Sequence, residues 1–242
     1  MSNIICLWSS PRNISTALMY SFAQRTQIKV IDEPFYAYYL THVAPKVNHP
    51  GKEDILASQY SNISEVIEHI EDTNEEKEII FIKNMTHHLR GVNLEFTKNW
   101  QHVILTREPQ RAIASFSKVI KHPSMNDLGY KLQYDLAVNF KKTNINFHLI
   151  NAENLTADPT KELELMCKYL NIDFDKKMLS WPKGGISGDG VWAKYWYKNV
   201  HNSNGFNLSS KINKIISDQE LIPLLKECNY FYKELLKIGN RN

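Results

Sequence analysis

The stretch WSSPRNISTALMYSFAQR, residues 8–25, overlaps the end of a short apolar run, IICLW, at residues 4–8. Its apolar and small residues recur with the spacing of a helix, at Ile14, Ala17, Leu18, Ser21 and Phe22. A buried strand, a polar loop and a helix in this order are typical of folds that bind phosphate groups, because the first N–H groups of a helix have no partner within it. The loop lacks both glycines and the lysine of Gly-x-x-x-x-Gly-Lys-Ser/Thr, which favours a terminal phosphate-type group without a metal over a metal-bound triphosphate.

The composition is typical of a globular chain without a strong charge bias. Of 242 residues, 43% are hydrophobic and 23% are charged, and 29 Lys and Arg against 26 Asp and Glu give a net charge of +3. This excess of cations is too small to indicate a nucleic-acid partner. The three cysteines, Cys6, Cys167 and Cys228, are scattered in apolar surroundings, which predicts buried, reduced thiols and a cytoplasmic location. The N-terminal apolar run is too short for a signal sequence or a membrane span.

Further apolar runs alternate with helical patterns along the chain. Unbroken runs of this kind are expected of strands that helices cover on both faces. The runs predict a P-loop-like three-layer α/β sandwich, with a mostly parallel sheet of about five strands. The other predicted strands are KVI at 29–31, EIIFIK at 78–83, HVILT at 102–106 and FHLI at 147–150. The other predicted helices are a stripe of Ala112, Ile113, Phe116 and Ile120, and residues 53–72, 127–142 and 158–170.

The character of the chain changes near residue 180, where glycines and aromatic residues become frequent. A final helical segment is predicted from about residue 209 to 238, interrupted at Pro223. No Gly/Ser/Pro-rich linker divides the chain, so we expect one domain over residues 1–242. Within it, residues 1–180 are the predicted α/β core, and residues 181–242 are a C-terminal aromatic loop with helices.

Two segments carry residues suited to binding anions. In SSPRNIST, at residues 9–16, Arg12 and two hydroxyl residues lie at the start of the first predicted helix; the simpler interpretation is an ordinary helix cap with a solvated arginine. In ILTREPQRAIASF, at 104–116, Arg107 leaves a predicted strand and Ser115 follows eight residues later, so both can bind one phosphate, although Arg107 alone fits a surface ion pair equally well. Two anion sites at neighbouring strand ends suit a nucleotide that is phosphorylated at two distant positions.

In their order and spacing these motifs resemble the sulfotransferases that use 3′-phosphoadenosine 5′-phosphosulfate. SSPRNIST resembles the 5′-phosphosulfate loop of that family, REPQRAIAS its 3′-phosphate motif, and INAENLTADPTKELELMCKYLNI at 150–172 a third family segment, so that the resemblance spans roughly residues 3–172. It implies a sulfotransferase-like enzyme with this nucleotide as co-substrate and without a metal. The residues that the resemblance assigns to the nucleotide are Ser10, Pro11, Arg12, Asn13, Ile14, Ser15, Thr16, Arg107 and Ser115.

Two departures from the family pattern affect these assignments. Ile14 stands where the family usually has glycine, so a slightly different path of the loop is expected. The C-terminal Arg-Lys-Gly element of the family is matched only loosely by PKGGISGDGVW at 182–192, where Pro182 replaces the arginine. Lys183 and Gly184 are therefore the weaker candidates for a contact with the 3′-phosphate.

The acceptor of a sulfuryl group needs a base within hydrogen-bonding reach. Glu33, in IDEPF, follows the second predicted strand, and a similar Glu-Pro-Phe is the base region in some bacterial carbohydrate sulfotransferases that this chain resembles. IKNMTHHL resembles the Lys-Thr-His-Leu stretch of cytosolic sulfotransferases, whose histidine is the base, which makes His88, beside His87, the competing candidate. We prefer Glu33 as the base over His88 and over the neighbouring Asp32, with Lys83 and His88 as neighbours of the sulfuryl group and Arg12 stabilising its charge.

Three questions stay open at this stage. The aromatic segment can be a loop that closes over the adenine or the acceptor, or simply core packing, and its residues are Trp181, Trp192, Tyr195, Trp196 and Tyr197. A nucleotide kinase or phosphotransferase, or a nucleotide-binding protein without catalysis, are the alternatives to a sulfotransferase. Neither the acceptor nor the oligomeric state is indicated by any residue pattern.

Overall fold

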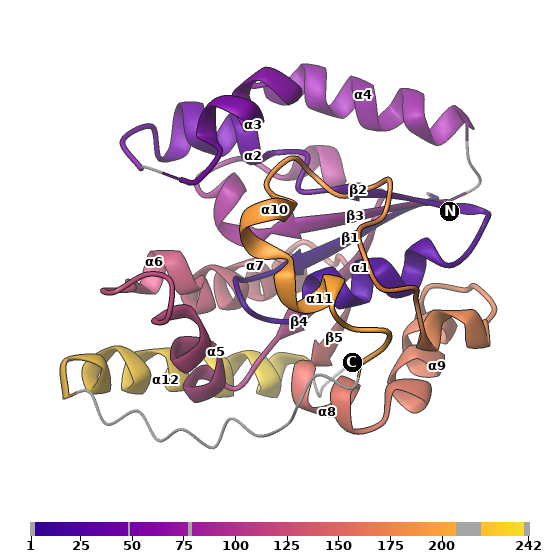
Figure 1. The fold of residues 1–242 in the computed structure, drawn as a ribbon. Coiled ribbons are helices and arrows are strands. Elements are labelled where there is room, and N and C mark those ends of the chain that lie inside the picture. Colours follow the sequence, from indigo (N-terminus) through magenta and orange to yellow (C-terminus); the bar gives the residue numbers. More distant parts are fainter. Residues whose placement is uncertain (1–2, 48, 77–78, 207–218, 240–242) are drawn as a thin grey trace.

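A parallel sheet of five strands, in the order β2-β3-β1-β4-β5, forms the centre of the fold (Figure 1). The computed structural model describes residues 3–47, 49–76, 79–206 and 219–239. The predicted three-layer α/β fold and each of its predicted strands are confirmed. The strands are β1 (Ile4–Ser9), β2 (Ile28–Asp32), β3 (Ile79–Met85), β4 (Gln101–Thr106) and β5 (Phe147–Asn151).

Strand β1 lies in the middle of the sheet, and all of its residues are buried. Side chains alternate between the faces of a strand, so Ile5 and Leu7 belong to one hydrophobic cluster and Cys6 and Trp8 to another. The Trp8 indole N–H donates to Nδ1 of His102 on β4 at 3.0 Å, which satisfies the polar atom of the large ring within the core. Burial on both faces explains why this strand reads as an unbroken apolar run.

Helices cover both faces of the sheet (Figure 1). On one face, α1 (Ser15–Ala23) and α9 (Pro159–Tyr169) contribute Leu18 and Leu163 to the core. On the other, Leu136 and Leu235 come from the helices that pack there. Those helices are α4 (Ile63–Glu76), α7 (Tyr130–Lys142) and α12 (Ile222–Gly239). The shorter helices include α2 (Tyr36–Tyr38), α5 (Pro109–Phe116) and α8 (Ala152–Ala157).

Two predicted helices are each divided in the structure. The helix predicted over 53–72 is divided into α3 (Lys52–Ser58) and α4. Between them the extended Gln59 uses its side-chain amide to accept from Ala37 N–H and to donate to the Glu33 carbonyl. The helix predicted over 127–142 is divided by Gly129, which has a φ of 71° and separates α6 (Met125–Leu128) from α7. In both places a tertiary contact or a turn overrides helical periodicity.

The segment of residues 180–206 runs across the molecule as the orange chain of Figure 1. It contains the short helices α10 (Ala193–Trp196) and α11 (Lys198–His201). Helix α12 then begins at Ile222, so Pro223 lies in its first turn, where the missing N–H has no intrahelical partner to lose. A 3-10 turn, Gln219–Leu221, precedes α12, and the part of the predicted helix before residue 219 lies outside the described residues.

We expect Gly129→Ala to lower the free energy of unfolding more than Gly91→Ala does. Both glycines have positive φ, 71° and 81°, a conformation that costs alanine about 1 kcal/mol. A Cβ at Gly129 would also lie 2.8 Å from Oγ of Ser10, whereas no described atom lies within 4 Å of one at Gly91. Urea unfolding of the two variants tests this, and equal losses would show that the contact with Ser10 does not constrain the loop after β1.

Candidate active site

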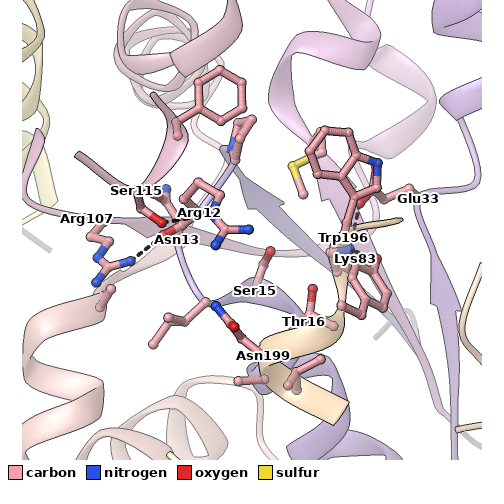
Figure 2. A pocket seen from close by; sticks show the side chains of 18 of the residues that line it. Arg12, Asn13, Ser15, Thr16, Glu33, Lys83, Arg107, Ser115, Trp196 and Asn199 are labelled. Carbon is pink, nitrogen blue, oxygen red and sulfur yellow. Dashed lines mark hydrogen bonds and ion pairs between the residues drawn. The ribbon is translucent and has the colours of Figure 1, made fainter. Parts of the chain in front are cut away.

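A cavity of about 770 Å³ opens where the loops that follow β1, β2, β3 and β4 meet the C-terminal segment. Every loop residue from Pro11 to Thr16 lines it, together with Glu33, Lys83 and Arg107. Figure 2 shows Ser15 and Thr16 between the arginine side chains and the pair of Glu33 and Lys83. The structure therefore gathers most of the predicted site residues around one space.

The loop after β1 has an unusual backbone. Arg12 and Ile14 have φ values of 64° and 63°, in the left-handed region that side chains other than that of glycine rarely adopt. Ile14 is also the residue before α1, and no side chain of the described residues caps this end of the helix. The unpartnered N–H groups of the first turn thus lie at the cavity, as expected for a site that binds an anion. At the position of the family glycine, the chain keeps a conformation that glycine adopts readily and holds a β-branched residue in it.

The two predicted anion sites adjoin each other. Nε of Arg12 donates to Oγ of Ser115 at 2.9 Å, and Nη1 of Arg107 donates to the carbonyl of Arg12 at 2.6 Å. Figure 2 shows this contact between the first loop and the helix after β4. The sequence placed Arg12 with one phosphate group and Ser115 with the other, and the structure brings the two side chains into direct contact.

The two guanidinium groups form a partly buried cationic region. Burial lowers the pKa of Arg12, and the neighbouring Arg107 lowers it further. Burial also lowers the pKa of Arg107, against the effect of Glu153, whose Oε1 lies 3.6 Å from Nε of Arg107. Glu153 comes from the third segment of the family resemblance and also lines the cavity. A pair of neighbouring, desolvated cations is stabilised by an anion, and the free N–H groups of α1 are beside it.

Not all of the predicted residues face the cavity. Asn13 does line it, but its Nδ2 donates to the buried carbonyl of Leu105, so this side chain also ties the loop to β4. Ser10 and Gly184 are not among the described residues that line the cavity, whereas Lys183 is. The Ser10 hydroxyl instead lies against Gly129.

Glu33 and Lys83 form a buried ion pair at the ends of β2 and β3. Nζ of Lys83 lies 2.7 Å from Oε1 of Glu33 and 2.7 Å from Oδ1 of Asp32, and the side chain of Lys83 is 0% exposed. Glu33 has a φ of 41°, and its N–H donates to the Lys83 carbonyl at 2.7 Å. This turn directs Glu33 to the cavity, while Asp32 is not among the described residues that line it.

The ionisation of this pair is set by burial. Burial raises the pKa of Glu33 to about 7, although Lys83 opposes the shift. Burial alone would lower the pKa of Lys83, but Asp32 and Glu33 outweigh it and raise the pKa. Lys83 therefore stays a cation, and Glu33 exchanges a proton near neutrality.

His88 lies within reach of Glu33, with Nε2 3.7 Å from Oε2. Its ring stacks on Tyr36 and Tyr39, with centroids 4.6 Å and 4.8 Å away. Burial lowers the pKa of His88 well below its ordinary value, and the neighbouring His87 adds to this shift. His88 is consequently a neutral imidazole within an aromatic cluster.

Tyr197, which the sequence indicated only as one member of the aromatic segment, bonds the residues at the strand ends. Its hydroxyl donates to Oδ2 of Asp32 at 2.6 Å and accepts from Nζ of Lys83 and, at 3.0 Å, from the indole of Trp192. Gly190 N–H also donates to Asp32, at 3.1 Å. The aromatic segment is thus anchored at the strand ends: Trp192 is buried in the core, and Trp196 and Tyr197 line the cavity. Only its richness in aromatic residues could have indicated this role.

Comparisons with known proteins agree with this geometry. Residues 3–236 match the sulfotransferase domain family. The chain belongs to this family. The predicted membership of the sulfotransferase family is confirmed.

Two curated plant relatives are similar to this sulfotransferase domain. They are the branched-chain-amino-acid aminotransferase-like proteins 1 and 2 of Arabidopsis thaliana, both 35% identical, over 209 and 210 residues. The matched region covers 86% of this chain but only 37% of each plant protein. The similarity therefore concerns one part of a much longer relative.

Solved sulfotransferase domains share the fold. The domain from the Synechococcus PCC 7002 olefin synthase is 16% identical with a TM-score of 0.62, and the match covers 95% of this chain and 94% of that one. The domain from the curacin biosynthetic pathway is 17% identical with a TM-score of 0.63, at 96% and 98% coverage. Among the described residues of this sulfotransferase domain, no helix is long and apolar enough to span a membrane.

We expect Lys83→Met to lower the free energy of unfolding by about 3–5 kcal/mol, because it leaves two buried carboxyl groups without their cation. Lys98→Met is the matched control, since Lys98 pairs with Glu95 at the surface and its side chain is 57% exposed. Such a pair contributes less than about 1 kcal/mol. Urea unfolding compares the two, and a loss at Lys83 no larger than at Lys98 would contradict the central role of this ion pair.

Proposed function

We propose that this sulfotransferase domain transfers a sulfuryl group from 3′-phosphoadenosine 5′-phosphosulfate to a hydroxyl or amine acceptor. The observation that carries the proposal is that two groups of residues line the same cavity. Arg12, Arg107 and Ser115 lie beside the N-terminus of α1, and Glu33 and Lys83 line another part of the cavity. One end offers cations and free N–H groups for an anionic nucleotide. The other offers a carboxylate for an acceptor.

The residues of the first loop and of α5 fit the two phosphate positions. The N–H groups at Ser15 and Thr16 suit the 5′-phosphate, and Arg107 with Ser115 suits the 3′-phosphate, for which Lys183 is a further cation on the cavity wall. Arg12 lies between these groups and suits the charge that grows on the bridging and sulfuryl oxygens. Sulfuryl transfer resembles phosphoryl transfer, in which positioning and cations provide most of the acceleration.

Glu33 is the proposed base that accepts the proton of the acceptor. It faces the cavity, whereas Asp32 is committed to Gly190, Tyr197 and Lys83. A base is most effective when its pKa lies near the working pH, which favours Glu33, with its raised pKa of about 7, over His88, with its lowered pKa. Lys83 keeps a positive charge beside the reacting group, and His88 stays a neutral neighbour.

Three further predictions accompany this proposal. Turnover without a metal ion rests on the family resemblance, and a single domain over residues 1–242 rests on the lack of a Gly/Ser/Pro-rich linker in the sequence. The cytoplasmic location rests on Cys6, Cys167 and Cys228, which are free and buried.

Arg107→Ala should weaken the binding of 3′,5′-bisphosphoadenosine about ten- to a hundredfold. A hydrogen bond to a charged group contributes about 1.5–3 kcal/mol, which corresponds to this range. AMP lacks the 3′-phosphate, so its affinity should change little. Calorimetric titration of both nucleotides measures the difference.

The control for Arg107 is Arg90→Ala, because Arg90 is an exposed arginine that is not among the described residues lining the cavity. It should leave both affinities unchanged. If Arg107→Ala weakened AMP and the bisphosphate equally, its role would be limited to its bond to the Arg12 carbonyl, and the assignment of the 3′-phosphate would be wrong.

The activity of the enzyme should rise with pH through a midpoint near 7, because Glu33 must lose its proton before it can accept one, and burial raises its pKa to about 7. Glu33→Gln should reduce turnover about 10²- to 10⁴-fold. It should leave the affinity for 3′,5′-bisphosphoadenosine nearly unchanged. The measurements are kcat/KM against pH, on the best acceptor from a panel of alcohols, phenols, amines and sugars, and a calorimetric titration.

His88→Ala is the comparison that decides between the two candidate bases. Its effect on turnover should be smaller than that of Glu33→Gln, and the midpoint near pH 7 should persist. Survival of activity in Glu33→Gln together with its loss in His88→Ala would assign the base to the histidine.

A further inference from the structure

Beyond Glu33, the cavity is lined by a set of rings that we call the ring wall: Tyr36, Tyr39, His49, His87 and His88. Nδ1 of His49 lies 2.6 Å from the Tyr36 hydroxyl, and the His88 ring stacks on both tyrosines. Trp192 meets Tyr36 edge to face, with centroids 5.1 Å apart. These contacts hold the rings in place, so the ring wall is a preformed, largely apolar surface.

Two buried polar atoms of the ring wall have no hydrogen-bond partner. Among the described residues, Nδ1 of His87 and Nδ1 of His88 are buried without a hydrogen-bond partner, although buried polar atoms usually have one. Both side chains line the cavity and are at most 9% exposed. Burial lowers the pKa of His87 to about 4 and also lowers the pKa of His88, so both imidazoles are neutral.

Apolar side chains from other segments contribute to the same cavity. Val47 and Pro50 follow the second strand, and Phe116 and Ile120 lie at and after the end of α5. Val47 and Ile120 are each 36% exposed and line the cavity, so they form part of its rim.

The charged residues that line the cavity are divided between its two ends. Arg12, Arg107, Arg111 and Lys183 accompany the proposed nucleotide site, where Glu153 pairs with two of these arginines. Near the ring wall the charged lining residues are Glu33, Lys83 and Asp127. Lys83 is engaged by two carboxylates. The charge of Asp127 raises the pKa of Tyr39, His49 and His87, while Arg90 or Lys52 lowers it. Of these three charged residues, Asp127 is the one that lines the cavity.

We propose that the acceptor is an uncharged hydroxyl compound with an apolar, ring-containing body, which lies along the ring wall with its hydroxyl at Glu33. This inference rests on the proposed sulfuryl transfer and narrows its acceptor. Asp127 and Glu33 repel an anionic acceptor, and the fixed cation of Lys83 beside Glu33 disfavours an ammonium group at the reacting position. A sugar without an apolar body gains little from the rings and the rim.

The test is calorimetric binding of three probes to the protein saturated with 3′,5′-bisphosphoadenosine. The probes are 2-naphthol, the anionic 6-hydroxy-2-naphthoate and glucose. We expect 2-naphthol to bind at least tenfold more tightly than either of the others. Binding of the bisphosphate itself is recorded first, so a failure of the nucleotide site is distinguished from a failure of the acceptor assignment.

Asp127→Asn should lower the ratio of the 2-naphthol affinity to the 6-hydroxy-2-naphthoate affinity by about threefold or more. The reason is that the variant lacks one carboxylate that lines the cavity. Asn still accepts a hydrogen bond from Ser124, which Asp127 does in the first turn of α6. The matched control is Asp135→Asn, which removes a surface carboxylate paired with Lys131 and should leave the ratio unchanged. Ile120→Ser, at the rim, should weaken 2-naphthol about three- to tenfold through lost apolar contact. Melting temperatures of all variants verify folding.

Two results would overturn the acceptor assignment while leaving the proposed function intact. One is tight bisphosphate binding together with equal affinities for 2-naphthol and its carboxylate. The other is a preference for glucose over 2-naphthol. Absence of bisphosphate binding would instead reject the proposed function, and the acceptor assignment with it.

Discussion

The buried ammonium of Lys83 is the interaction on which the rest of the site depends. It joins the ends of two neighbouring strands through Asp32 and Glu33, and it reaches the C-terminal segment through Tyr197. Charges this far from water are tolerated only when each has a partner, so the strand ends and the segment must close together. That closure forms one wall of the cavity and turns Glu33 toward it.

The two ends of the cavity differ in their charged groups. Around the first loop, two arginines lie near the start of a helix. Their charges repel each other and the positive end of the helix dipole, and a bound anion would reduce this repulsion. Around Glu33, burial raises the pKa of a carboxyl group while it lowers the pKa of the neighbouring His88. The same desolvation thus acts on both ends of the cavity, which we propose to hold the nucleotide at the arginines and the acceptor at Glu33.

Much of the fold could be predicted from sequence because its signals are local. The strands are short apolar runs, and α1 and α9 have plain helical periodicity. The exceptions were tertiary. Gln59 leaves a helical pattern to bond the backbone of Ala37 and Glu33, and Gly129 separates two helices where periodicity alone predicted one. Periodicity shows which face of a helix is apolar, but it contains no information on the hydrogen bonds that one residue makes to a distant segment.

For the site, the sequence by itself determined the residue types and their places at strand ends: Arg12, Glu33, Lys83 and Arg107 all follow or end a predicted strand, and parallel strands bring such ends to one edge. Only the tertiary structure decided how they combine. The contact of Arg12 with Ser115 joins residues 103 positions apart, and that of Lys83 with Tyr197 joins residues 114 positions apart. Their partners depend on the path of the chain between them, as does the fact that Glu33 lines the cavity while Asp32 bonds Lys83 and Tyr197, because a hydrogen bond requires a distance and a direction that residue order does not specify.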